Sequence, residues 1–329
     1  MIHPIPPGTR DVLPDEMREL RKLLTALIEM FEEKGYGQVA TPALEYDEVL
    51  TRGRDRDQGA AYRFFDESGD LVALRSEMTV PIARLVATRY ANAEPPHRFC
   101  YVAAAFRPVS PQRGQMREIL QAGVELIGAP AAAGAVEVIE VLEAALDVAG
   151  LKSAVIGLGD ADLHRDLLAE LGLAEEAAGS VLGRLAAHDL VGLEAELGAA
   201  GVPEEKLRAC STLLDLRGGA EVLGRARELG SAAARAADRL EAIARDLGSR
   251  PSGDRVQFDF GLMRDLDYYN GPIFEVYDPE VGHPLGGGGR YDGLMERFGL
   301  DLSAAGFALS LERVEVAQVE ERRRGEGGG

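Results

Sequence analysis

The sequence predicts an α+β protein in which a mostly antiparallel sheet is flanked by helices. Apolar residues recur every three or four positions from Met17 to Phe31, which is the spacing of an amphipathic helix. Between 36 and 127, successive strand-like segments are joined by hairpins and loops more often than by single crossover helices, which favours antiparallel pairing. Residues 173–250 are rich in Ala, Leu, Glu and Arg, so we expect a helical insertion there.

Length, charge and cysteine content limit the class of protein. A chain of 329 residues suits about two domains, and its net charge of -19 disfavours nucleic acid as a partner, because phosphate binding requires a basic surface. Cys100 and Cys210 are far apart and only five histidines are present, so we expect neither a metal site nor a disulfide. The start resembles no signal peptide and no long apolar run occurs, so we expect a cytoplasmic protein that does not cross a membrane.

The N-terminal third supplies the first candidate binding residue. The helix is expected to end near Gly35, and a short strand at 36–41 stops at a proline. Residues 62–74 are typical of two strands around a Ser-Gly-Asp turn, and they lead into the segment LRSEMTVPIAR. Glu77 lies there among apolar neighbours, and a buried carboxylate is costly unless it is paired, so a ligand or an ion-pair partner is expected.

Two polar residues are expected on one strand face in the next segment. A strand at 98–107 and a loop at 110–117 precede a return strand that carries Gln121 and Glu125. Side chains four apart on a strand point to the same face, so these two can line one pocket. A helix follows at 134–148, and the later glycine pair before a helix fails the dinucleotide-binding fingerprint.

A cation, phenols and glycines are concentrated between 255 and 313. Arg264, Tyr268 and Tyr269 follow a strand, and a run of four glycines precedes Tyr291. Hydroxyls and a guanidinium suit a small zwitterion, because they supply directional hydrogen bonds and one charge. Adjacent tyrosines are also typical of cross-strand packing, and a glycine run is typical of a loop, so a purely structural role stays open.

These segments resemble the histidyl-tRNA synthetase family. The matching stretches are RDLDYY at 264–269, GGRYDGL at 288–294, the third class II motif GFALSLER at 306–313, the second-motif layout at 98–127, and the first-motif region around PPGTRDVLP. The resemblance extends from Pro6 to Val314 and implies the fold of a class II aminoacyl-tRNA synthetase catalytic core. In the family the first motif builds a homodimer interface, so a homodimer is expected, although an ordinary helix and strand packed within one subunit would fit the same residues.

The resemblance also implies which residues bind ligand. The residues expected to bind histidine are Glu77, Thr79, Arg107, Gln121, Glu125, Arg264, Tyr268, Tyr269 and Tyr291. Arg117 and Arg313 would remain from an ATP site. No residue is expected to be catalytic, and no metal or cofactor is expected.

The chain departs from the family at the positions that handle ATP. Val109 stands where a glutamate is expected, Gln115 replaces an arginine, Ile119 replaces an aromatic residue, and Met78 replaces glycine beside Glu77. Loss of a charge-assisted phosphate bond removes about 1.5 to 3 kcal/mol. A pocket that binds histidine without activating it is therefore predicted.

These departures resemble a non-catalytic branch of the family, the regulatory subunits of ATP phosphoribosyltransferase. The acidic charge fits this branch, as do the 16 residues after Arg313, where synthetases continue into an anticodon-binding domain. The resemblance implies histidine as allosteric effector and the short-form catalytic subunit as partner, in a hetero-octamer that performs the first step of histidine biosynthesis. A truncated histidyl-tRNA synthetase or a free-standing histidine-activating ligase is the main alternative, since Arg264 and Arg313 are kept; a tRNA-binding module is disfavoured by the charge.

The expected boundaries divide the chain into three parts. Residues 1–172 and 251–316 would form the synthetase-like core, and residues 173–250 the helical insertion. Residues 317–329, a polar tail, are expected to be disordered.

Overall fold

The protein consists of two compact units. The computed structural model describes residues 5–53, 61–108, 116–173, 175–186, 189–248, 255–264 and 268–327. One unit combines the described parts of 1–154 and 277–329, and the other comprises those of 155–276.

A sheet with largely antiparallel pairing forms the centre of the first unit. Its strands, in spatial order, are β1 (Gly37–Gln38), β5 (His97–Phe106), β6 (Glu118–Ile127), β12 (Ala304–Ser310) and β11 (Gly286–Arg290). β1 pairs with β5 in parallel, whereas β5 with β6, β6 with β12 and β12 with β11 are antiparallel. The predicted antiparallel character is confirmed.

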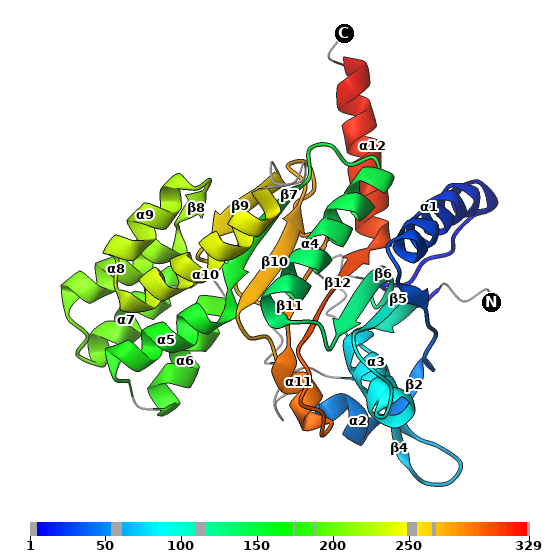
Figure 1. Cartoon of the computed structure of the whole chain (residues 1–329), viewed down its shortest axis with the longest axis horizontal. Coiled ribbons are helices and arrows are strands. Elements are labelled where there is room, and N and C mark those ends of the chain that lie inside the picture. The colour runs from blue at the N-terminus through cyan, green and yellow to red at the C-terminus, as the bar shows by residue number, and fades with distance from the viewer. Residues whose placement is uncertain are drawn as a thin grey trace. The chain divides into compact units, whose positions relative to one another are not determined.

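Two long helices cover one face of this sheet. Helices α1 (Pro14–Glu33) and α4 (Ala131–Val148) pack on each other and against β5, β6 and β12, as Figure 1 shows. The apolar stripe predicted for α1 is the buried side, and the ring of Phe31 meets that of Phe307 at 6.1 Å between centroids. Gly35, with φ of +87°, follows the last turn, as expected for a residue that ends a helix.

The first unit also contains a small three-stranded sheet and several short helices. In this sheet β4 (Leu71–Leu74) is paired antiparallel with β2 (Leu44–Tyr46) and β3 (Arg63–Phe65). The short helices are α2 (Asp47–Thr51), α3 (Thr79–Leu85), the π-helical turn η1 (Val86–Tyr90) and α11 (Asp292–Arg297). The segment between β4 and α3 carries Glu77, so the small sheet fixes where this residue meets the main one.

The expectation of a disordered tail from 317 is wrong for the described residues. Helix α12 (Leu311–Gly327) continues from β12 and extends beyond the strands in Figure 1. Ala317 is fully buried, the Gln318 amide donates to Ala149 O at 2.7 Å, and Glu321 accepts the backbone N–H groups of Lys152 and Ser153 at 2.9 and 2.8 Å. These contacts hold the helix to the loop after α4, which sequence composition alone does not reveal.

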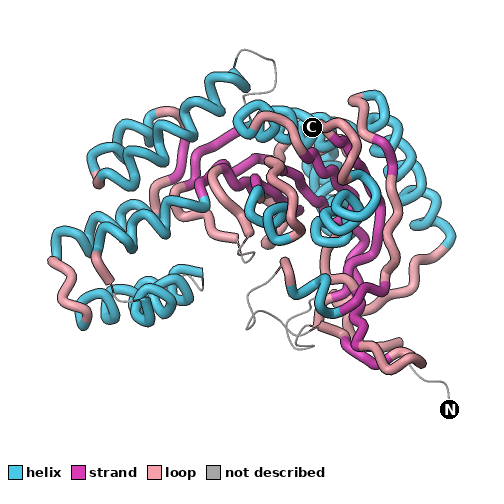
Figure 2. The backbone as a smooth tube through the Cα atoms, turned by 60° about the horizontal axis from the view of Figure 1, so that its bottom comes forward, coloured by secondary structure: helices cyan, strands magenta, loops and turns pink. Residues whose placement is uncertain are grey.

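The second unit joins four strands to a set of helices. Its strands, in spatial order, are β10 (Pro272–Tyr277), β7 (Val155–Asp160), β9 (Val256–Asp259) and β8 (Arg217–Gly218). Its helices, cyan in Figure 2, are α5 (Ala161–Leu171), α6 (Glu175–Ala186), α7 (Leu190–Ala199), α8 (Glu204–Leu214), α9 (Glu221–Glu228) and α10 (Ser231–Gly248). β7 and β9 lie before and after the expected insertion at 173–250 and pair in parallel. The second unit, 155–276, therefore extends beyond that insertion at both ends. That insertion as a separate domain stays a prediction.

A helix that spans a bilayer must be about 20 residues long and largely apolar. Among the residues that the structure describes, no helix combines the length and the apolar character needed to span a membrane.

Candidate functional site

The two faces of the main sheet differ in chemistry. Glu125 of β6 lies opposite Gly306 of β12, and Gln121 lies opposite Ser310, so both residues project from one face as predicted. On the other face Val124 pairs with Phe307 beneath the long helices. One side of these strands therefore belongs to the apolar core, and the other presents a carboxyl and an amide group.

Glycines keep space for the carboxyl group. A Cβ atom at Gly306 would lie 1.9 Å from Oε2 of Glu125, and one at Gly288 would lie 1.9 Å from the backbone oxygen of Gly306. The glycine run that precedes Arg290 is thus not a loop but the strand β11, paired with β12. Gly286 and Gly288 are required by the close approach of β12, because a Cβ atom at either would meet its backbone.

Hydrogen bonds join four of the predicted residues into one group, which we call the carboxylate cluster: Glu77, Thr79, Glu125 and Tyr291. The hydroxyl of Thr79 donates to Oε1 of Glu125 at 2.8 Å, and the hydroxyl of Tyr291 donates to Oε2. The backbone N–H of Thr79 donates to Oε2 of Glu77 at 2.6 Å. Residues from β6, from the start of α3 and from the segment before α11 therefore meet at one place.

The two carboxyl groups of the cluster have different surroundings. Both oxygens of Glu77 accept backbone N–H groups, from Thr79 and from Val80 at 3.1 Å, which favours the ionised form. Glu125 is 1% exposed, and its pKa is raised to about 8 by burial, opposed by the hydrogen bonds from Tyr291 and Thr79 and increased by the charge of Glu77. The cluster therefore holds a carboxyl group bonded to two backbone N–H groups beside a buried carboxyl group whose pKa is raised to about 8.

Gln121 and Arg107 lie in the same unit, with less defined roles. Gln121 is buried, and its Oε1 has no hydrogen-bond partner among the described residues, so an acceptor is available on the face that carries Glu125. The exposed side chain of Arg107 donates from Nε to Ser76 O at 3.1 Å, one residue before Glu77. Both positions are compatible with the predicted site, although no described contact joins Arg107 to the cluster.

The residues expected from an ATP site have other contacts. Nε of Arg117 is buried without an acceptor among the described residues, while Arg313 donates to the backbone oxygen of Pro284. No described contact links Arg117 and Arg313. Val109 and Gln115 lie outside the described residues.

Met78 is buried inside the first unit. It is 1% exposed, and its sulfur lies 3.9 Å from Oγ1 of Thr41. Met78 therefore packs within the core of this unit.

In the second unit, the other three predicted residues lie together. The guanidinium of Arg264 lies 5.6 Å from the ring centroid of Tyr269, whose ring lies 5.0 Å from that of Tyr268. Arg264 also pairs with Glu275 of β10 at 3.2 Å, a partner that sequence reasoning missed. Glu275 lies between Phe274 and Val276 in a strand of apolar residues, and a charged residue in such a strand is a sign that it has a partner.

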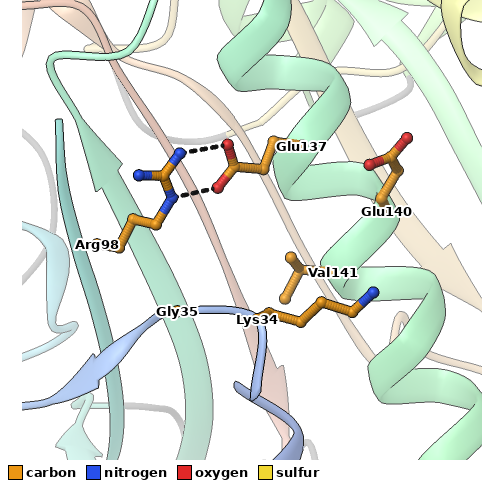
Figure 3. A pocket seen from close by; sticks show the side chains of 6 residues that line it. All are labelled: Lys34, Gly35, Arg98, Glu137, Glu140 and Val141. Atoms are coloured by element: carbon orange, nitrogen blue, oxygen red, sulfur yellow. Dashed lines mark hydrogen bonds and ion pairs between the residues drawn. The ribbon is translucent and has the colours of Figure 1, made fainter. Parts of the chain in front are cut away.

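Sequence reasoning also missed a polar network on the helix side of β5. Arg98 binds Glu137 of α4 through two hydrogen bonds of 2.7 and 2.8 Å, and the hydroxyl of Tyr36 donates to the same carboxylate at 2.9 Å. Figure 3 shows the Arg98–Glu137 pair at the edge of an open cavity of about 330 Å³, with Lys34 and Glu140 nearby. The pKa of Glu137 is lowered by the hydrogen bond from Arg98, so this carboxylate is already neutralised.

No group of three or more potential metal ligands occurs among the residues that the structure describes. The carboxylate cluster contains only two carboxyl groups and two hydroxyls, and their hydrogen bonds to one another use several of their oxygen atoms. Its chemistry is that of hydrogen bonding to a ligand with N–H groups.

Comparison with known proteins identifies the family. A family model described as histidyl-tRNA synthetase matches residues 8–314. The chain is 41% identical over 319 residues to the ATP phosphoribosyltransferase regulatory subunit of Moorella thermoacetica, covering 96% of this chain and 82% of the relative.

Two solved structures agree in fold. One, from Bacillus halodurans C, is described as an ATP phosphoribosyltransferase regulatory subunit/histidyl-tRNA synthetase; it has a TM-score of 0.87 at 31% identity, covering 97% of this chain and 84% of that chain. The other, a histidine–tRNA ligase subunit from Alicyclobacillus acidocaldarius, has a TM-score of 0.84 at 32% identity, covering 98% and 99%. The synthetase-like α+β fold predicted from the sequence is confirmed, and the chain belongs to the family of ATP phosphoribosyltransferase regulatory subunits, relatives of the histidyl-tRNA synthetases.

Proposed function

We propose that this chain is a non-catalytic subunit that binds histidine at the carboxylate cluster and transmits its presence to a catalytic phosphoribosyltransferase subunit. One observation carries the proposal: a buried carboxyl group, Glu125, lies beside the carboxylate of Glu77 on a glycine-lined strand face, and no lysine, arginine or histidine among the described residues bonds to Glu125. Glu125 thus has no cationic partner within the described part of the chain, and histidine supplies two nitrogen groups that carry or accept a proton.

The cluster offers a separate partner to each end of the ligand. Both oxygens of Glu77 already accept backbone N–H groups, so its carboxyl group suits a further N–H donor such as the α-ammonium group, which is positive at neutral pH. The acceptor oxygen of Gln121 and the carboxyl of Glu125 lie further along the same strand face and suit N–H donors of the imidazole. That Arg264, Tyr268 and Tyr269 also bind histidine stays a prediction from the family resemblance.

Regulation follows from linkage between histidine and the state of the complex. If the inhibited arrangement of the complex binds histidine more tightly than the active one, histidine shifts the population toward inhibition. The names of the relatives, regulatory subunits of ATP phosphoribosyltransferase, support a catalytic partner. The same proposal has three further parts. The chain activates a short catalytic subunit, it forms a homodimer, and it assembles with that subunit into a hetero-octamer in the cytoplasm.

A histidine-activating ligase is the second candidate. Arg117, Arg264 and Arg313 are kept at positions where the synthetases handle ATP, and one structure at 32% identity is described as a histidine–tRNA ligase subunit. Against it stand the substitutions at Val109 and Gln115. The two candidates differ in one reaction, the formation of an adenylate from histidine and ATP.

Two measurements on the purified full-length chain separate these functions. Isothermal titration calorimetry with histidine is expected to show saturable binding, and histidine-dependent exchange of labelled pyrophosphate into ATP is expected to be absent. Binding together with exchange would establish the ligase instead. A folded chain that binds no histidine, alone or with the catalytic subunit, would contradict the proposal.

A further inference from the structure

The environment of Glu125 has a consequence for how its ligand binds. The carboxyl group is 1% exposed, and its hydrogen-bond partners are two neutral hydroxyls, those of Thr79 and Tyr291. A buried carboxylate without a cation is unfavourable, so the group keeps its proton until a positive partner arrives.

Among the described residues, the groups that act on the pKa of Glu125 include no positive charge. The segment before α3 brings the carboxylate of Glu77, the segment before α11 brings the phenol of Tyr291, and β5 brings the phenol of Tyr101 two residues from the position paired with Glu125. Tyr36, before β1, is close enough for the charge of Glu125 to raise its pKa, after the larger effect of burial. None of these groups carries a positive charge. Burial and the charge of Glu77 raise the pKa of Glu125, and the hydrogen bonds from Tyr291 and Thr79 offset only part of that rise.

We infer that bound histidine and Glu125 share a single proton between the imidazole and the carboxyl group. Histidine binding then releases a proton to solvent below neutral pH and takes one up above it. The inference rests on the proposed function and adds the regulation of that site by pH. At neutral pH the free imidazole is mostly unprotonated and the free Glu125 is protonated. Binding then moves the proton from the carboxyl oxygen toward an imidazole nitrogen, and none is exchanged with solvent.

The proton balance changes on either side of neutrality. In acid, histidine arrives as the imidazolium and Glu125 still carries its proton, so binding must release one. In alkaline solution both groups have lost their protons, so binding must take one up. Histidine affinity is therefore highest between the two pKa values and declines in both directions, by up to about tenfold for each pH unit.

Calorimetry of the full-length chain in pairs of buffers with different ionisation enthalpies measures this proton directly. The expected result is release approaching one proton at about pH 5.5, almost none at about pH 7, and uptake at about pH 8.5, beyond the fraction due to the ammonium group of free histidine. The variant Glu125→Gln is expected to bind more weakly and to lose the uptake at high pH while keeping the release at low pH.

The outcomes separate this inference from the function on which it rests. If wild-type protein binds histidine at about pH 8.5 without taking up a proton, the inference is wrong and the function stands. If histidine does not bind at any pH, the proposed function fails. Should Glu125→Gln bind too weakly to measure, the affinity of the wild type between neutral and alkaline pH decides: a constant affinity overturns the inference, and a decline supports it.

Discussion

Two carboxylate–tyrosine pairs in the described part of the first unit differ in charge and in burial. Tyr36 donates to Glu137, and Tyr291 donates to Glu125. Glu137 also receives two hydrogen bonds from Arg98, which lower its pKa, whereas Glu125 has no cationic partner among the described residues and burial raises its pKa. The first pair is electrostatically complete and joins α4 to β5; the second still lacks a positive group.

This difference distinguishes a structural network from a binding site. A complete ion pair gains little from a ligand, because a new charge would have to displace Arg98. A buried carboxyl group without a cation, such as Glu125, is stabilised by any positive group that fits beside it. Until one binds, the hydroxyls around it offset part of the free-energy cost of its burial. The same substitution in the two pairs should therefore affect histidine binding in one and only stability in the other.

The largest effect is expected from Gly306→Ala. The new Cβ atom would lie 1.9 Å from Oε2 of Glu125 and 2.5 Å from Val124 O, so the carboxyl group or the strand must move. We expect histidine affinity to fall by more than about a hundredfold, measured by calorimetry. Gly224→Ala in α9, where a Cβ atom meets nothing within 4 Å, is the control and should bind histidine normally. Normal binding by Gly306→Ala would show that Glu125 does not contact the ligand.

Next in size is the matched pair Glu77→Gln and Glu137→Gln. Glu77→Gln removes the charge that faces the α-ammonium group, a loss of about 1.5 to 3 kcal/mol, or roughly tenfold to a hundredfold in the dissociation constant. Glu137→Gln removes the same charge from the complete network and should leave histidine affinity unchanged. Equal effects on affinity from both variants would remove the distinction between the two pairs.

The pH dependence of stability should differ in sign between the two pairs. The pKa of Glu125 is higher in the folded than in the unfolded chain, so the ligand-free protein loses stability as pH rises from the unfolded value toward about 8. The pKa of Glu137 is lowered, so its contribution is present above the unfolded pKa and is lost as pH falls through the folded one. Urea unfolding across this pH range should therefore show a shallower loss of stability from about pH 4.5 to about pH 8 for Glu125→Gln, and a shallower acid decline for Glu137→Gln. The same pH profile in both variants would contradict the assigned pKa directions.

The smallest effect is expected when one hydroxyl is removed from each pair. Tyr291→Phe deletes a donor to Glu125 at a cost of about 0.5 to 1.5 kcal/mol, which corresponds to a severalfold loss of histidine affinity. Tyr36→Phe deletes the equivalent donor to Glu137 and should change only thermal stability. A larger loss of histidine affinity from Tyr36→Phe than from Tyr291→Phe would indicate that histidine binds near Glu137 and not at the carboxylate cluster.

Much of this arrangement follows from the sequence, because strand periodicity is simple. Gln121 and Glu125 are four residues apart, which is sufficient to place them on one face. The link between Tyr291 and Glu125 is different, since it depends on the register of β11, β12 and β6 and connects residues 166 positions apart. Residue chemistry marked Tyr291 as a candidate, but only the resemblance to a known family placed it in the same predicted site as Glu125.

Other features depended on contacts that local patterns do not contain. The glycines before Arg290 have the composition of a loop, yet they form a strand because close strand approach excludes side chains. The polar sequence after Arg313 is typical of a disordered tail, yet Gln318 and Glu321 bind backbone groups near Ala149 and Lys152. The ion pair between Arg264 and Glu275 depends on how the second unit folds, which the local sequence around either residue does not specify.

The most direct test of the central claim is the response of a reconstituted complex to histidine. The chain and its catalytic subunit are combined, and phosphoribosyl transfer is followed as histidine is added, with Glu77→Gln beside the wild type and assembly checked by size. We predict that histidine inhibits the wild-type complex and that inhibition by Glu77→Gln requires at least about tenfold more histidine, with assembly unchanged. The same inhibition in both complexes, or no inhibition of the wild type, would contradict the assignment of the carboxylate cluster as the effector site.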